Sequence, residues 1–274
     1  MAAVPETTEE SILELRDVDA AYGPFRAIFG VSFALPKGRV LALLGSNGAG
    51  KTTIARVCSG LIVPTSGRVF FGGADVTGQR AFRYARLGIV HAPEGRSVFA
   101  SLSVEENLEL TFQRSRGRAG VKEAVDEAFT MFPRLSERRH QVAGTLSGGE
   151  QRMLSLSRVM VEKPRLLIAD ELSLGLAPII VDEVYRNLQT IRETGTTLMI
   201  VEQHVHHALA IADDAVVLLK GEVAYSGPVS ELGDLQARLL GGGGESDARI
   251  PEADRGDPTA ACRTRRVASR GPVW

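Results

Sequence analysis

The sequence has few cysteines, no long apolar run and no excess of either charge. Two cysteines, Cys58 and Cys262, among 274 residues exclude the disulfide framework that small secreted domains use. No segment approaches the roughly 18 consecutive apolar residues of a membrane-spanning helix, and residues 1–10 lack the apolar core of a signal peptide. Because 32 Lys and Arg offset 33 Asp and Glu, no global positive field indicates nucleic acid binding. We expect an intracellular protein.

Short apolar runs alternate with helical periodicity along most of the chain. Residues 40–44, 166–169, 197–201 and 215–219 have the length and composition of strands buried on both faces. Helix-like stretches separate these runs, and that alternation predicts an α/β fold with a parallel sheet.

The ends of the chain and its middle differ from this pattern. Residues 12–40 predict strands broken by Gly-Pro and Pro-Lys-Gly turns, and helical character dominates from about 98 to 163. Residues 1–11 and 241–274 lack apolar periodicity, and we expect both to be disordered. The sequence therefore predicts one folded domain over 12–240.

One glycine-rich segment fits the phosphate-binding pattern G-x-x-x-x-G-K-[ST] without a mismatch. It reads Gly45, Ser46, Asn47, Gly48, Ala49, Gly50, Lys51, Thr52, and Thr53 follows. Its glycines let the backbone close on a phosphate with successive N–H groups pointing inward, and the helix start adds a partial positive charge. Lys51 would reach the β- and γ-phosphates, and Thr52 would ligand Mg²⁺. We expect these residues to bind ATP.

An apolar strand ending in two carboxylates follows later in the chain. Residues 166–171 read Leu-Leu-Ile-Ala-Asp-Glu, which is the Walker B arrangement. Asp170 would hold Mg²⁺ directly or through water, and Glu171 would polarise the attacking water as general base. Together with the glycine-rich loop, this strand predicts nucleotide hydrolysis.

A second phosphate-binding element precedes that strand. Residues 146–151 read Leu-Ser-Gly-Gly-Glu-Gln and open a helix-like run. Ser147, Gly148, Gly149 and Glu150 would therefore present a hydroxyl and backbone N–H groups at a helix N-terminus. One nucleotide site does not need both elements, so we expect this one to serve a nucleotide bound by a partner subunit.

Residues 146–151 resemble the signature motif of ATP-binding cassette (ABC) ATPases, and their position before the Walker B strand is that family's order. The resemblance covers about 12–240. It implies a P-loop NTPase fold with a RecA-like core, an N-terminal antiparallel β-subdomain and a helical subdomain at about 96–163. It also implies a head-to-tail dimer with each ATP between one subunit's Walker motifs and the other's signature. ATP would close this dimer, and hydrolysis would open it and drive a membrane partner.

The same resemblance assigns roles to further residues. Tyr22 is similar to the aromatic residue that stacks on adenine, with core packing as the alternative. Glu94 stands where the family has a glutamine that contacts Mg²⁺, and is implied as a metal contact. Gln203 stands at the position of the switch histidine and His204 follows one residue late, so both are implied in catalysis. Leu172 replaces the usual proline, and the aspartate common in the next loop is missing.

Four segments narrow the resemblance to the LivF-type ATPases of branched-chain amino acid importers: 93–96, 104–108, 174–181 and 201–203. The implied function is ATP hydrolysis, with ATP and Mg²⁺ bound, coupled to import of branched-chain or related amino acids. The implied partners are two integral membrane permease subunits, a second ABC ATPase subunit, identical or paralogous, and an extracytoplasmic solute-binding protein. The chain would be peripheral on the cytoplasmic face of the plasma membrane.

Three alternatives stay open at this point. Importers of urea or short amides have similar sequences. A non-transport ABC ATPase acting on ribosomes or DNA would usually carry a second cassette or a long coiled coil, and the sequence has neither. A module that closes on ATP without turnover is opposed by Glu171 but favoured by Gln203 and the missing aspartate.

Overall fold

The computed structural model describes residues 10–93, 98–203 and 205–233. By internal contacts the chain divides into two units, 1–242 and 243–274, and every described residue belongs to the first. Among the described helices, none combines the length and the apolar character needed to cross a bilayer.

A six-stranded sheet forms the centre of this unit, in the order β10-β9-β3-β8-β7-β6. The strands from β9 to β6 run parallel, whereas β10 is antiparallel to β9. The strands are β3 Val40–Gly45, β6 Ile89–Ala92, β7 Leu166–Asp170, β8 Thr197–Glu202, β9 Asp214–Leu219 and β10 Glu222–Pro228. Every residue of β3, β7 and β8 is buried, which confirms the parallel sheet that the continuous apolar runs predicted.

A second sheet is antiparallel and four-stranded, in the order β2-β1-β4-β5. Its strands are β1 Ser11–Tyr22, β2 Phe25–Pro36, β4 Ser66–Phe71 and β5 Ala74–Asp75. The break between the two long strands falls at Gly23, whose φ is +59°, as the Gly-Pro turn predicted. The N-terminal antiparallel β-subdomain is thereby confirmed.

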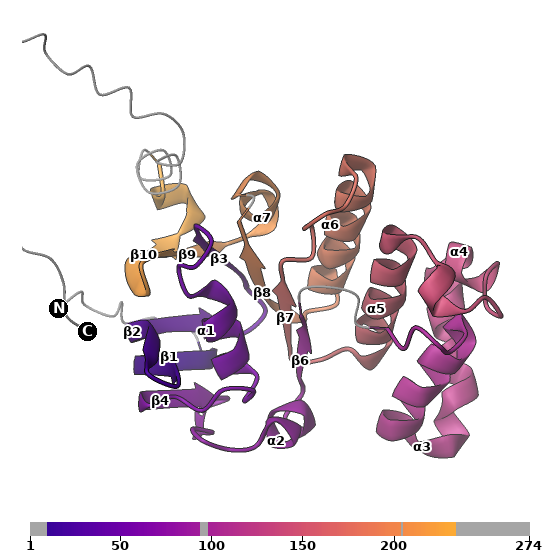
Figure 1. Cartoon of the computed structure of the whole chain (residues 1–274), viewed down its shortest axis with the longest axis horizontal. Coiled ribbons are helices and arrows are strands. Elements are labelled where there is room, and N and C mark those ends of the chain that lie inside the picture. The colour runs from indigo at the N-terminus through magenta and orange to yellow at the C-terminus, as the bar shows by residue number, and fades with distance from the viewer. Residues whose placement is uncertain (1–9, 94–97, 204, 234–274) are drawn as a thin grey trace, which may run out of the picture. The chain divides into compact units, whose positions relative to one another are not determined.

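Two hydrophobic cores lie on the two faces of the parallel sheet because successive side chains of a strand point to opposite faces. One core joins Leu41, Leu43 and Ile168 to the antiparallel sheet and to α1, Lys51–Cys58, and α2, Ala81–Arg86. The other joins Ala42, Leu44 and their neighbours to α6, Pro178–Glu193, and α7, Val205–Ile211. Figure 1 shows α1 and α6 on these two sides of the sheet.

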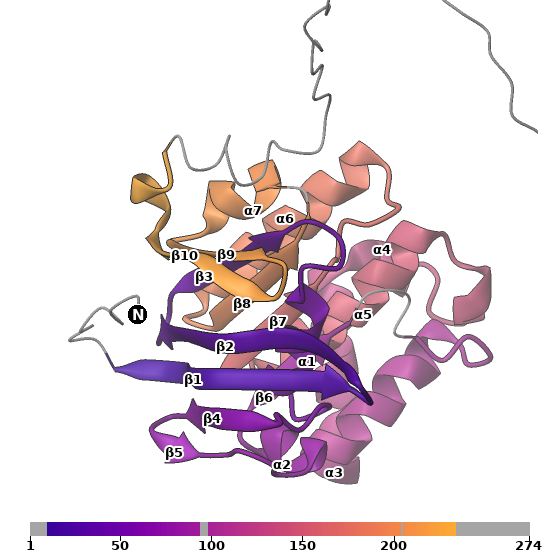
Figure 2. The same ribbon diagram turned by 60° about the vertical axis from the view of Figure 1, so that its left-hand side comes forward.

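The helical part has a core of its own. It consists of α3 Val104–Met131, α4 Pro133–Ser136, the short 3-10 turn Ala143–Thr145 and α5 Gly148–Glu162, and Figure 2 shows α3, α4 and α5 gathered together. Ser103 caps α3 through a capping box with Glu106, and Gly117 interrupts that helix with φ +67°. A second 3-10 turn, Val229–Glu231, is the last regular element of the described residues.

Candidate nucleotide-binding site

The predicted motifs meet at one edge of the parallel sheet, because the carboxyl ends of parallel strands lie side by side. The register pairs Leu44 of β3 with Glu202 of β8, and Val201 of β8 with Asp170 of β7. The loop after β3, the two carboxylates after β7 and the segment after β8 therefore emerge together.

The glycine-rich loop between β3 and α1 closes around the ammonium group of Lys51. Lys51 Nζ donates to the backbone oxygens of Gly45 at 3.0 Å and Ser46 at 3.3 Å. It also lies 3.5 Å from Glu171 Oε1, and the Lys51 side chain is only 4% exposed. Residues 46–48 at the tip of the loop are exposed. The loop around the buried Lys51 ammonium group is therefore accessible to a ligand from solvent.

Glycine is required at Gly50, which immediately precedes α1. Its φ is +104°, and a Cβ there would lie 2.7 Å from Ile28 Cγ2 and 3.0 Å from the Ala27 oxygen. A side chain would therefore meet both backbone strain and a clash. The position holds the start of α1 against β2 and directs the first N–H groups of the helix toward the loop.

Asp170 and Glu171 differ sharply in environment. Asp170 is 1% exposed, and its Oδ1 lies 3.5 Å from the hydroxyl of Thr52. Glu171 has a left-handed backbone, φ +47°, and its N–H donates to the Val201 oxygen at 2.8 Å. That turn, unusual for a residue other than glycine, brings the Glu171 carboxylate to Lys51, where a base for an attacking water is expected.

His91 belongs to the site, although no sequence motif includes it. It lies in β6 opposite Ile168, and its Nε2 is 3.6 Å from Asp170 Oδ2. Its Nδ1 lies 3.0 Å from the hydroxyl oxygen of Ser59. Neither His91 Nε2 nor Asp170 Oδ2 has a hydrogen-bond partner in the described part of the chain. A polar residue within the apolar β6 run was the one available signal.

Glu202 is a further buried carboxylate at this edge. It accepts hydrogen bonds from the Ser173 N–H at 3.2 Å and the Ser173 hydroxyl at 3.0 Å. Burial raises the pKa of Glu202 above its usual value, although the Ser173 hydrogen bonds oppose that shift. Glu202 thus joins the end of β8 to the segment that follows β7.

The signature residues form the start of α5, the helix that precedes β7 along the chain. Ser147 is the N-cap, and its N–H and hydroxyl both donate to Glu150 Oε2 at 2.9 Å. Burial opposes ionisation of Glu150, but these hydrogen bonds and the charges of Arg138 and Arg134 together hold the pKa of Glu150 below its usual value. A Cβ on Gly149 would lie 2.9 Å from Ile180 Cγ2, so only glycine lets α5 and α6 approach so closely. Gly148 is the first residue of α5.

The remaining predicted residues have mixed outcomes. Tyr22 is 43% exposed at the end of β1, and its hydroxyl oxygen lies 3.2 Å from Arg56 Nη1 and 3.5 Å from Thr53 Oγ1. Its ring is therefore available next to α1, and adenine stacking stays a prediction. Gln203 is exposed directly after β8, beside the loop of β3. Glu94 and His204 lie outside the described residues, as does Cys262, whereas Cys58 is buried and unpaired.

The donor set fits a nucleotide with a divalent cation. Asp170 and Thr52 offer hard oxygen ligands of the kind that Mg²⁺ prefers, and Mg²⁺ is commonly held by one or two carboxylates together with substrate phosphates. Within the described ranges, no group of three or more His, Cys, Asp or Glu could hold a metal by itself. Asp170 Oδ1 beside the Thr52 hydroxyl, together with the charged Lys51, is what such a shared site requires.

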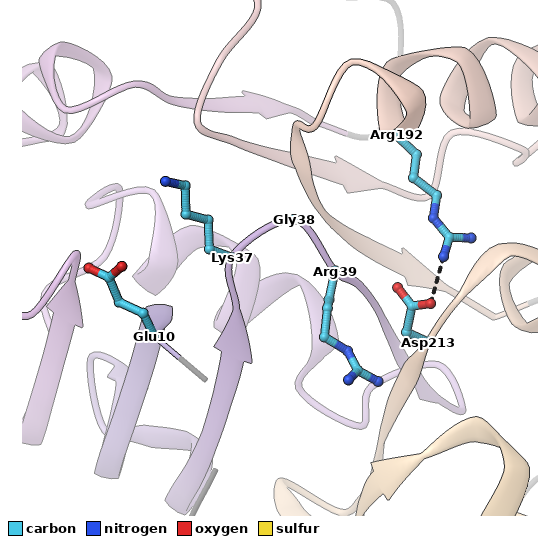
Figure 3. A pocket seen from close by; sticks show the side chains of 6 residues that line it. All are labelled: Glu10, Lys37, Gly38, Arg39, Arg192 and Asp213. Carbon is cyan, nitrogen blue, oxygen red and sulfur yellow. Dashed lines mark hydrogen bonds and ion pairs between the residues drawn. The ribbon is translucent and has the colours of Figure 1, made fainter. Parts of the chain in front are cut away.

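A hollow of about 560 Å³ lies at the opposite edge of the sheet, where the parallel strands begin. Its lining comprises Glu10, Lys37, Gly38, Arg39, Arg192 and Asp213. Figure 3 shows Arg192 directed at Asp213, with Nη2 and Oδ1 2.6 Å apart. Arg39 likewise pairs with Asp214 at 2.8 Å. Two arginines of this edge are thus paired with carboxylates of the same edge.

Comparison with known proteins agrees with this geometry. Residues 28–173 match the family model described as ABC transporter. The high-affinity branched-chain amino acid transport ATP-binding protein BraG of Pseudomonas aeruginosa is 40% identical, over 77% of this chain and 91% of that protein. The probable branched-chain amino acid transport ATP-binding protein LivF of Archaeoglobus fulgidus is 35% identical, over 78% of this chain and 91% of that protein.

Solved structures give the same result. An ATP-binding cassette of an ABC transporter in its ADP conformation superposes with a TM-score of 0.73 at 25% identity, covering 84% of this chain and 97% of that one. A nucleotide-free ATP-binding cassette gives a TM-score of 0.70 at 26% identity, covering 80% and 91%. With the Walker and signature elements in place, this chain belongs to the ABC transporter family and is one of its ATP-binding, ATP-hydrolysing subunits.

Proposed function

We propose that this chain hydrolyses ATP, with Mg²⁺ bound, to drive import of branched-chain or related amino acids. The observation that carries the proposal is the meeting of Lys51, Asp170 and Glu171 at one sheet edge, with Lys51 Nζ 3.5 Å from Glu171 Oε1. The solute class rests on the printed functions of BraG and LivF, both aligned over more than three quarters of this chain.

The chain's own residues divide the work of the reaction. The backbone of residues 45–53 holds the phosphates, with Lys51 exchanging the Gly45 and Ser46 oxygens for phosphate oxygens. Thr52 and Asp170 hold Mg²⁺, which when bound neutralises charge on the phosphates. Tyr22 stacks on adenine, and Glu94 is a further contact to Mg²⁺.

Release of Lys51 frees Glu171 for its catalytic role. In the described state the carboxylate of Glu171 is occupied by the ammonium group. When Lys51 turns to phosphate, Glu171 is free to orient a water and accept its proton as general base. Gln203 and His204 complete the site from the segment after β8, where an amide or imidazole can hydrogen-bond a phosphate oxygen.

The proposal includes a second ABC ATPase subunit whose signature residues complete the site. Ser147, Gly148, Gly149 and Glu150 in turn serve the partner's nucleotide, since the N–H groups at the start of α5 favour an anion. Two integral membrane permeases and an extracytoplasmic solute-binding protein are the other proposed components. The chain then lies on the cytoplasmic face of the plasma membrane, with its ATPase domain at 12–240.

An uptake experiment tests the solute and the chemistry together. Cells that natively express the chain are deleted for it and complemented with wild type or Glu171→Gln, and uptake of radiolabelled leucine and urea is measured. We expect wild type but not Glu171→Gln to restore leucine uptake. Restoration of urea uptake alone would favour the short-amide alternative.

Affinity purification tests the partners. The tagged chain is recovered from detergent-solubilised native membranes, and its partners are identified by mass spectrometry. Two multi-spanning proteins and a second cassette ATPase are expected. Ribosomal or DNA-associated proteins in their place would contradict the transport assignment.

A further inference from the structure

We propose that His91 is a positioning residue for the Walker B carboxylate, donating a hydrogen bond from Nε2 to Asp170 Oδ2 and so directing Oδ1 toward the metal position. This inference rests on the proposed function, because it concerns how Asp170 is presented to Mg²⁺. It assigns a role to a side chain outside every motif named above.

The strand register places the two side chains on one face of the sheet. His91 is paired with Ile168, and Asp170 lies two residues beyond Ile168 on the same strand, so it shares that face. This is the face on which Ile168 packs against the core around α1. His91 thus lies between the end of α1 and the end of β7.

Burial makes this contact different from a surface ion pair. The side chains of His91 and Asp170 are 8% and 1% exposed, with 3.6 Å between Nε2 and Oδ2. Both atoms are buried, and neither has another hydrogen-bond partner in the described ranges. A buried polar group without a partner is destabilising, so closing this 3.6 Å contact to a hydrogen bond would satisfy both atoms at once. Hydrogen bonds of a catalytic site are often long before ligand binds.

Ser59 fixes the orientation of the imidazole ring from its other side. The Ser59 hydroxyl oxygen, at the end of α1, is 3.0 Å from His91 Nδ1 and 2.9 Å from the Ala55 oxygen. The hydroxyl carries one proton, which can be donated to only one of these two acceptors. We assign it to Nδ1, and the ring proton then resides on Nε2. The ring then presents an N–H to Asp170.

The two oxygens of Asp170 are thereby distinguished. Oδ2 faces His91, and Oδ1 faces the Thr52 hydroxyl at 3.5 Å, the other expected metal ligand. Hydrogen bonds to a ligating carboxylate fix its orientation, and their loss typically weakens metal affinity or activity about 10- to 100-fold. His91 therefore acts on the metal only through Asp170.

The test uses the full-length chain and three readouts. Mn²⁺ affinity in the presence of ADP is measured by electron paramagnetic resonance, ADP affinity in EDTA by fluorescent-nucleotide titration, and folding by thermal melting. His91→Leu removes the donor, whereas His91→Gln keeps an N–H at similar reach. His140→Leu is the matched control, because the His140 side chain is 81% exposed.

We expect His91→Leu to weaken Mn²⁺ binding about 10-fold, with ADP affinity in EDTA unchanged, and His91→Gln to restore affinity to within about threefold. His140→Leu should match wild type. Equal Mn²⁺ affinity in His91→Leu and wild type, or no rescue by His91→Gln, would overturn the role of His91 alone. Absence of nucleotide binding by wild type would overturn the proposed function as well.

A second variant covers the case in which His91→Leu does not fold. Ser59→Ala leaves His91 and Asp170 in place and removes only the hydroxyl that orients the ring. We expect Mn²⁺ affinity to fall about threefold. This loss is smaller than that in His91→Leu because the imidazole beside Asp170 is still present. Wild-type affinity in a folded Ser59→Ala would contradict the proposal.

Discussion

The two edges of the parallel sheet carry the same kinds of side chain in opposite states. Where the strands begin, Asp213 accepts from Arg192 and from the Val40 N–H at 2.8 Å, so its charge is matched by protein groups. Where they end, Asp170 Oδ2 and His91 Nε2 are buried without a hydrogen-bond partner in the described residues. A carboxylate whose hydrogen bonds are made within the protein stabilises the fold, whereas a buried pair held at 3.6 Å, longer than a hydrogen bond, can still close when a ligand binds.

The hollow and the candidate catalytic residues also lie at different edges of the sheet. The hollow of about 560 Å³ lies at the amino edge, while the residues with catalytic chemistry lie at the carboxyl edge under an exposed loop. Changes at the carboxyl edge should therefore affect turnover and ligand affinity, and changes at the amino edge should affect stability.

The largest expected effect is on turnover in Glu171→Gln. The amide cannot accept a proton from water, so steady-state ATP hydrolysis should fall at least about 100-fold, with ATP binding retained. A coupled phosphate-release assay and a fluorescent-ATP titration check the two parts. Turnover near wild type would show that Glu171 is not the base.

Lys51→Ala should act next most strongly, on affinity. Removing a charged hydrogen-bond donor from the phosphates costs about 1.5–3 kcal/mol, or roughly 10- to 100-fold in nucleotide affinity. The titration used for Glu171→Gln measures it, with Lys37→Ala at the other edge as the control. Equal loss in both variants would contradict the division between the edges.

Asp213→Ala, at the amino edge, should instead lower the stability of the fold. It leaves the Val40 N–H and the Arg192 guanidinium without their carboxylate, so we expect the free energy of unfolding to fall by about 1–3 kcal/mol. Urea unfolding measures this loss, and ATP hydrolysis per folded molecule should stay at the wild-type value. Reduced hydrolysis at equal folding would argue that the amino edge belongs to the site.

A smaller effect is expected from the pH dependence of stability in Glu202→Gln. Because burial raises the pKa of Glu202, the folded chain keeps this proton to higher pH than the unfolded chain. Its contribution to the free energy of unfolding is therefore present at low pH and is lost as pH rises through the folded pKa. Glutamine does not titrate, so the free energy of unfolding of the variant should rise relative to that of wild type as pH increases. Urea unfolding at several pH values measures this difference. A stability difference between variant and wild type that does not change with pH would contradict burial as the dominant influence on the pKa of Glu202.

The smallest effect is predicted for deletion of residues 241–274, which lie outside the described residues. Their composition lacks apolar periodicity, so ATP hydrolysis should be unchanged. A steady-state assay on the truncated chain checks this prediction. A large loss would place part of the site or of the folding core in that segment.

The sequence predicted the parts of the fold whose signal is local. The buried strands β3 and β7 followed from their apolar runs, and the start of α1 followed from the pattern ending in Lys51-Thr52. His91 and Glu202 were missed as members of this edge because their partners, Asp170 and Ser173, are distant from them in sequence. Only the register between β6 and β7 places His91 next to Asp170. The roles of Tyr22 and Gln203 stay predictions.

The most direct test of the central claim is a crystal structure of Glu171→Gln with ATP and Mg²⁺. The difference between the two edges predicts phosphate density on residues 45–53, with Asp170 and Thr52 turned toward the metal and His91 in hydrogen-bonding distance of Asp170. Nucleotide bound instead in the hollow beside Lys37, Arg39 and Arg192 would contradict it.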